Sequence, residues 1–165
     1  MAELTNLESK LGEVVGLAMA AQEAGQKVAK LAQDDGNEEL VGALERMREE
    51  AKETEERGTE VAGSFEGKKT AILDEAREVK QKAQQMMKTY LDEASDALDG
   101  FEFLTMAEAG EVGHWEILGT LNERARKSEV SSLVDWALPI QQRHLQEVLD
   151  GSLKLAADED PDEEE

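Results

Sequence analysis

The sequence predicts an all-α protein: a four-helix bundle with one additional connecting helix and an acidic C-terminal tail. Three observations lead to this fold class. Apolar residues recur at helical spacing along almost the whole chain, proline occurs only twice in 165 residues, and aromatic residues make up 4% of the total. Because the turn signals are few and well spaced, the predicted helical domain covers residues 1–157.

The first two predicted helices form a hairpin. The first covers about residues 4–31, and its apolar seam has a period close to 3.6. Gly36 permits a positive φ and Asn37 can cap a helix, so these two residues predict a turn. The second helix then covers about residues 38–65 and exposes a face of alternating charges.

The third predicted helix, residues 70–98, differs from the others because its apolar stripe is thin. Such a stripe is typical of a helix that lies over a bundle. Gly100 is predicted to cap its C-terminal end. A fourth helix at residues 101–127 and a fifth at 129–157 complete the bundle, with Ser128 as the N-cap of the fifth.

The end of the chain differs sharply in composition from the predicted helices. Residues 158–165 read DEDPDEEE and hold seven carboxylates. Such a charge run cannot bury apolar surface, so the sequence predicts a disordered acidic tail.

The charge of the chain restricts its partners. The net charge of −21 disfavours nucleic acid and anionic membrane surfaces, and no apolar run is long enough to span a bilayer. The chain has no cysteine, and we expect a cytoplasmic protein. Three interpretations of the acidic surface stay open: solubility, adaptation to high internal salt, and attraction of cations.

The two histidines lie at matching positions in the last predicted hairpin. Strict a/d spacing places Glu111 and His114 in the seam of the fourth helix and His144 in that of the fifth. If the turn centres near Glu129, the two histidines each lie fifteen positions from it, and Glu111 and Glu147 each lie eighteen. Antiparallel packing then predicts that two imidazoles and two carboxylates converge, a donor set that suits iron, manganese or zinc.

The spacing of these donors is also informative. Glu-x-x-His places both groups on one helix face, as in di-metal helix bundles. Glu111 and His114 have this spacing, whereas the last helix has Gln141 three residues before His144.

The stretch FEFLTMAEAGEVGHWEILGTL, followed by an antiparallel helix, resembles the ferritin-like superfamily and is most similar to its YciE/YciF-type stress-associated branch. That branch carries a His-aromatic-Glu-Ile element on its third core helix, here His114-Trp115-Glu116-Ile117. The resemblance implies a ferritin-like four-helix bundle, a homodimer, and iron or manganese in the bundle core. The expected function is therefore that of a stress-associated metal-binding protein. The predicted metal ligands are Glu111, His114, His144 and Glu147, with Glu116 and Gln141 orienting them or reaching the ion through water.

The first two helices depart from the family's pattern. A complete di-iron centre takes carboxylates from all four core helices. The seam offers Ala18 and Ala21 in the first helix and Met47 in the second. The nearest acids lie off the seam: Glu23 in the first helix, and Glu50 and Glu53 in the second. The two acids of the second helix reach inward only if the register shifts by one residue.

Alternatives to a metal centre within one chain stay open. The histidines can be buried residues that bond to Glu111, Glu147 or a backbone carbonyl, or the site can be completed across a two-fold axis. A metal-free helical interaction module that lost its centre is the alternative function. The sequence leaves open whether the protein is an enzyme, although it lacks the motifs of a metal-free hydrolase or transferase.

The remaining features near the histidines have structural interpretations. Trp115 and Trp136 are expected to be packing or interface residues. The glycines of the fourth helix indicate close helix packing or, alternatively, room for a ligand beside His114: Gly110, Gly113 and Gly119.

Overall fold

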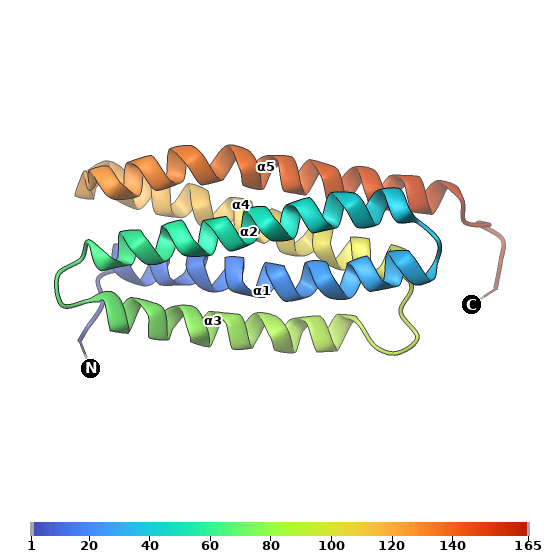
Figure 1. Ribbon diagram of the computed structural model, residues 1–165, viewed down its shortest axis with the longest axis horizontal. Coiled ribbons are helices and arrows are strands. Elements are labelled where there is room, and N and C mark those ends of the chain that lie inside the picture. Colours follow the sequence, from blue (N-terminus) through green and yellow to red (C-terminus); the bar gives the residue numbers. More distant parts are fainter. Residues whose placement is uncertain (1, 165) are drawn as a thin grey trace.

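The computed structural model describes residues 2–164, which fold into five α-helices with no β-strand among them (Figure 1). The predicted all-α class is thus confirmed. None of these helices is both long enough and apolar enough to cross a bilayer within the described range. The helices are α1 (Asn6–Asp34), α2 (Glu38–Gly63), α3 (Lys69–Tyr90), α4 (Ala97–Ala125) and α5 (Ser128–Ala157).

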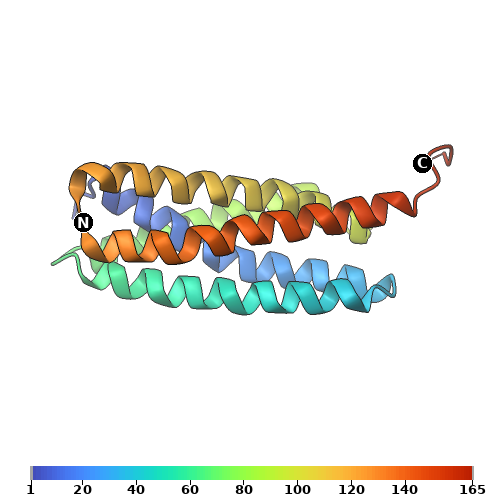
Figure 2. The same ribbon diagram turned by 90° about the horizontal axis from the view of Figure 1, so that it is seen from above.

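Four of the helices form a four-sided bundle. α1 contacts α2 and α4, and α5 contacts α4 and α2, so α1 and α5 are diagonally opposite. In Figure 2, α5 lies between α4 and α2 in the view from above. α3 runs back along the outside of α1, and α2 and α4 therefore point in the same direction (Figure 1). Each helix of the bundle is antiparallel to both of its neighbours.

The outer position of α3 follows from its sequence. Only Ala71, Ile72 and Ala76 of this helix are buried, all near its start. The prediction that the third helix lies over the bundle is confirmed, because α3 packs mainly against α1 and its apolar stripe is too thin for a helix enclosed on all sides.

Two of the predicted helix caps are wrong, and the predicted turn between the first two helices is confirmed. Gly100 caps nothing: it lies inside α4, which begins at Ala97, and its Cα faces Val28 of α1. The N-cap of α5 is Lys127, and Ser128 is already helical. The turn at Gly36 is confirmed by a φ of 77°.

Side-chain capping fixes the starts of α1 and α4. The backbone N–H of Glu8 donates to Thr5 Oγ1 (3.2 Å), and the N–H of Thr5 donates to Glu8 Oε2 (2.8 Å). Asp96 and Asp99 form the same reciprocal pair at the start of α4. These bonds satisfy backbone donors that have no partner inside the helix.

The acidic segment after α5 is not helical. Residues 158–164 form turns and irregular structure, and all of them are exposed. Disorder of this tail stays a prediction. Met1 and Glu165, which the sequence assigns to the domain and to the tail, lie outside the described residues.

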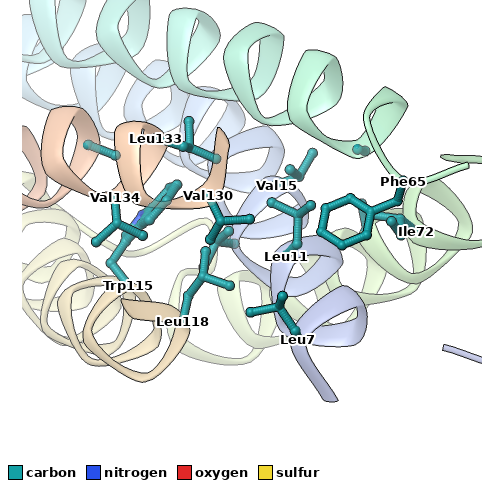
Figure 3. Packing of buried hydrophobic residues seen from close by; sticks show 14 residues of the cluster. Leu7, Leu11, Val15, Phe65, Ile72, Trp115, Leu118, Val130, Leu133 and Val134 are labelled. Carbon is teal, nitrogen blue, oxygen red and sulfur yellow. The ribbon is translucent and has the colours of Figure 1, made fainter. Parts of the chain in front are cut away.

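The interior contains two apolar clusters, one toward each end of the bundle. The first joins the starts of α1, α3 and α5 to the ends of α2 and α4, and includes Trp115, Leu118 and Val130 (Figure 3). The second joins the other ends of the same bundle and includes Phe101 and Val148. Polar side chains occupy the level between the two clusters, and they form the candidate site described below.

A close approach of backbones holds α3 on α1. A Cβ at Gly16 would lie 2.3 Å from the carbonyl oxygen of Ala76, so Gly16→Ala should push α3 outward and lower the free energy of unfolding by roughly 1–3 kcal/mol. Gly42, in α2, has no atom within 4 Å of such a Cβ. Gly42→Ala should therefore stabilise the protein by about 0.5–1 kcal/mol. Urea unfolding of both variants measures the difference, and equal effects would contradict the close α1–α3 contact.

Candidate functional site

Four polar side chains form a layer between the two apolar clusters. Glu108 and Glu111 come from α4, and Gln141 and His144 come from α5. Each is only 3–5% exposed to solvent. Each pair is spaced by three residues, so both members lie on the face of their helix that points into the bundle. The layer therefore places two carboxyls, an amide and an imidazole in the protein interior.

Glu108 lies at the centre of this layer. Gln141 Nε2 donates a hydrogen bond to Glu108 Oε2, and His144 Nδ1 lies 3.9 Å from the same oxygen. Burial raises the pKa of Glu108 to about 8; the bond from Gln141 opposes this rise and the charge of Glu147 adds to it. The carboxyl is therefore mostly protonated at neutral pH.

Glu111 is the second buried carboxyl. Burial raises its pKa well above the ordinary value, and the neighbouring Glu108 adds to the rise. No hydrogen-bond donor or cation among residues 2–164 lowers that pKa. A buried carboxyl without a donor is costly, and such groups are found where a proton or a bound cation neutralises them.

His144 lies between two carboxyls from different helices. Its Nε2 is 3.4 Å from Glu50 Oε1 of α2, and its Nδ1 faces Glu108. Burial lowers the pKa of His144, Glu50 opposes that effect, and Arg143 adds to it. A neutral imidazole keeps one nitrogen free to accept a hydrogen bond or bind a metal ion.

Arginines neutralise the acids at the edge of the layer. Arg143 binds Glu50 through both of its terminal nitrogens, and Arg46 Nη2 lies 2.8 Å from Glu147 Oε1. The hydrogen bond from Arg143 lowers the pKa of Glu50, against the effect of burial. Glu147 Oε2 is buried and has no hydrogen-bond partner among the described residues. Glu147 is thus an ion-paired residue with one oxygen directed into the protein.

His114 is placed differently from His144. Its side chain is 37% exposed, and its Nδ1 lies 3.1 Å from Glu13 Oε2 and 3.2 Å from Lys10 Nζ, both on α1. Burial lowers the pKa of His114, Lys10 adds to this, and Glu13 opposes it. The two imidazoles share no hydrogen-bond or ion-pair partner within residues 2–164, so the predicted convergence of the two rings is not observed.

The predicted seam of α4 is wrong by one residue at several positions. The prediction placed Ala107, His114 and Leu121 inward, whereas the structure buries Glu108, Trp115 and Asn122. Trp115 is only 1% exposed, and it belongs to the apolar cluster as expected of a packing residue.

The other predicted residues divide between the layer and the surface. Glu111 and Gln141 lie in the layer, whereas Glu116 is exposed. Of the three off-seam acids, only Glu50 reaches the layer; Glu23 bonds to Gln84 and Glu53 to Arg57.

The glycines of α4 do not share one role. Gly119 packs against Val134, because a Cβ added at this glycine would lie only 3.3 Å from that side chain. Gly110 and Gly113 have no atom within 4 Å of such a Cβ, so close packing does not explain them. Gly110 instead borders a cavity, which agrees with the alternative that these glycines leave room for a ligand.

Sequence reasoning missed Glu108. Two seams of α4 start at Leu104, one continuing through Ala107 and the other through Glu108. The second also places Trp115 inward, and the preference of a large aromatic residue for the interior could have decided between them.

Two spaces adjoin the layer. One, of about 10 Å³, is lined by Glu108, Gln141, His144 and Met47, which is close to the size that one water molecule needs. The other, of about 190 Å³, lies between α1, α3 and α4 and is lined by Glu108 and Glu111. Glu108 thus borders both spaces.

Within residues 2–164, no group of three or more His, Asp or Glu side chains surrounds one point suited to a metal ion. Comparison of the chain with protein-family models, curated proteins and solved structures gives no match in any of the three.

Proposed function

We propose that this chain is a ferritin-like protein that binds one iron or manganese ion in the polar layer, through Glu108, Glu111 and His144. The observation that carries the proposal is the pair of buried carboxyls one helical turn apart, with a buried imidazole 3.9 Å from the first of them. Carboxylate and imidazole donors suit these metals. Of these three ligands, Glu111 and His144 belong to the set inferred from the sequence, and Glu108 is new.

The arrangement of the helices supports the ferritin-like class. Ferritin-like bundles contain two helical hairpins and one long crossover. Here α1–α2 and α4–α5 are the hairpins, and α3 is the crossover that makes α2 and α4 parallel (Figure 1). The resemblance of the segment around His114 to the YciE/YciF-type branch extends the proposal to a stress-associated role. A homodimer and a cytoplasmic location stay predictions from the sequence.

The dimensions of the layer support a single ion. Bonds of about 2.1 Å from one ion to an imidazole nitrogen and a carboxylate oxygen span up to about 4.2 Å, and Glu108 Oε2 and His144 Nδ1 are 3.9 Å apart. The space of about 10 Å³ adjoins both side chains. Glu111 would complete the set by turning its side chain toward Glu108.

Each residue of the layer has a distinct role in this proposal. Glu108 and Glu111 release their protons when a cation replaces them, because only the ionised carboxylate binds a metal. Gln141 fixes the orientation of Glu108 through its hydrogen bond. Glu50 can orient the ring of His144 through Nε2 and leave Nδ1 free to bind. Bound iron would supply electron transfer to oxygen or peroxide.

A metal-free helical module is the second candidate function. It is favoured by the arginines that bind Glu50 and Glu147, since those ion pairs already neutralise both acids. The inward positions of α1 beside the layer hold Ala21 and Gly25, and neither can bind a metal through its side chain.

Elemental analysis of protein purified without chelator distinguishes the two candidates. Wild type is expected to hold near-stoichiometric iron or manganese, and Glu108→Gln and His144→Gln should each lose most of it. His114→Gln is the matched control and should retain the metal, because His114 bonds to α1 outside the layer. A metal-free wild type whose unfolding temperature ignores added ferrous and manganous ions would overturn the metal proposal.

A further inference from the structure

The cavity between α1, α3 and α4 has a strongly asymmetric lining. Its volume is about 190 Å³. Most of the side chains that line it are small or apolar, including Ala20, Ala83, Ala107 and Phe103. The exposed Met86 also lines it. Its polar lining comes mainly from α4, which contributes Glu108, Glu111 and His114, and α3 adds Gln84. Such a space suits a molecule with an apolar body and one polar group.

The carboxyls decide which polar group fits. Glu111 is 5% exposed and has no donor or cation beside it among the described residues. Within residues 2–164, Glu108 has one donor, Gln141, on the side away from α1 and α3. A group that approaches through the cavity therefore meets carboxyl oxygens that lack a partner. An ammonium group can replace the protons of these carboxyls and donate to the resulting carboxylates, whereas an anionic ligand cannot.

We propose that this cavity binds a small organic amine, with the ammonium group on Glu111 and Glu108 and the apolar body between α3 and α4. The open space over Gly110 agrees with a ligand at this wall. The cavity is somewhat larger than the roughly 150 Å³ cavity that binds benzene, so one aromatic ring with a short aminoalkyl group matches its size. The ammonium ion and the metal ion would compete for Glu111, but amine binding does not depend on the metal.

Three matched ligands test the proposal on the full chain after dialysis against chelator. Benzylamine, benzyl alcohol and benzoate have similar apolar bodies but are cationic, neutral and anionic. Isothermal titration calorimetry should show that benzylamine binds about tenfold or more tightly than benzyl alcohol, as one charged hydrogen bond predicts, and that benzoate does not bind. Glu111→Gln should reduce the affinity for benzylamine by about the same factor and change that for benzyl alcohol little.

Matched variants of α4 locate the ligand. Ala107→Leu fills the cavity and should abolish binding of benzylamine, whereas Ala109→Leu, at an exposed position of the same helix, should not. Circular dichroism checks that both variants fold, and Ala83→Leu fills the same cavity from α3 if Ala107→Leu does not.

Separate outcomes bear on the amine and on the metal. His144→Gln should remove the metal and leave benzylamine binding intact, so either proposal can fail alone. Equal affinity for benzylamine and benzyl alcohol, no binding of any of the three ligands, or unchanged binding in the cavity-filling variant would overturn the amine proposal.

Discussion

Metal-free Glu108→Gln is expected to unfold at a clearly higher temperature than wild type at pH 9, and at nearly the same temperature at pH 5. The fold raises the pKa of Glu108 from 4.5 to about 8, mainly through burial. The stability that the neutral carboxyl contributes is complete below pH 4.5 and is lost as pH rises through 8, because the unfolded chain releases this proton earlier. The loss amounts to at most about 5 kcal/mol, or roughly 10–20 °C in unfolding temperature.

The glutamine at position 108 would keep the bond from Gln141, since its side-chain carbonyl also accepts a hydrogen bond. Burial lowers the pKa of His144, which reduces stability as pH falls below 6.5, but this effect is common to both proteins and cancels in the comparison. Glu116→Gln controls for the loss of one negative charge from an exposed position of α4. A constant difference between wild type and Glu108→Gln from pH 5 to pH 9 would show that Glu108 is not held neutral by burial.

Trp115→Ala is expected to lower the free energy of unfolding by about 3–5 kcal/mol, because it opens a large cavity in a packed interior. Trp115 is 1% exposed and belongs to the same apolar cluster as Leu118 and Val130 (Figure 3). Urea unfolding followed by far-ultraviolet circular dichroism measures the change.

Trp136→Ala is the matched control for this substitution. Trp136 is only partly buried at the edge of the same cluster, and Arg57 Cζ lies 4.2 Å from the centre of its ring. An exposed contact of this kind contributes about 0.5–1 kcal/mol, so this variant should lose well under half as much stability as Trp115→Ala. Equal losses would contradict the burial of Trp115.

The positions of the helices could be predicted from the sequence because the apolar period persists along each of them. The main error is the end of the third helix, predicted at Leu98 and observed at Tyr90. Leu91 and Leu98 continue the apolar pattern, but hydrogen bonds between Asp92 and Ser95 form a turn between the helices. Hydrogen bonds between nearby side chains and the backbone end the helix here, and the spacing of apolar residues gives no information about such bonds.

The candidate site could be predicted only in part. Glu111 and His144 can be recognised because they interrupt apolar seams on their own helices, and Gln141 because it lies three residues before His144. The environment of His114 depends on Lys10 and Glu13, about a hundred positions earlier in the chain. A single sequence does not show which residues of different helices meet, so the partners of both histidines required the structure.

The polar layer also determines how the helices align along the bundle axis. A slip of α5 past α4 by one turn, about 5.4 Å, would bring apolar Ala137 to the level of Glu108 and carry Gln141 to the level now held by His144. Glu108 would then lose the hydrogen bond from Gln141 while remaining in the interior. Apolar contacts alone would specify this register less strictly, because after a slip of one turn an apolar side chain can still meet another apolar side chain. The hydrogen bond between Gln141 and Glu108 thus specifies one register for α4 and α5.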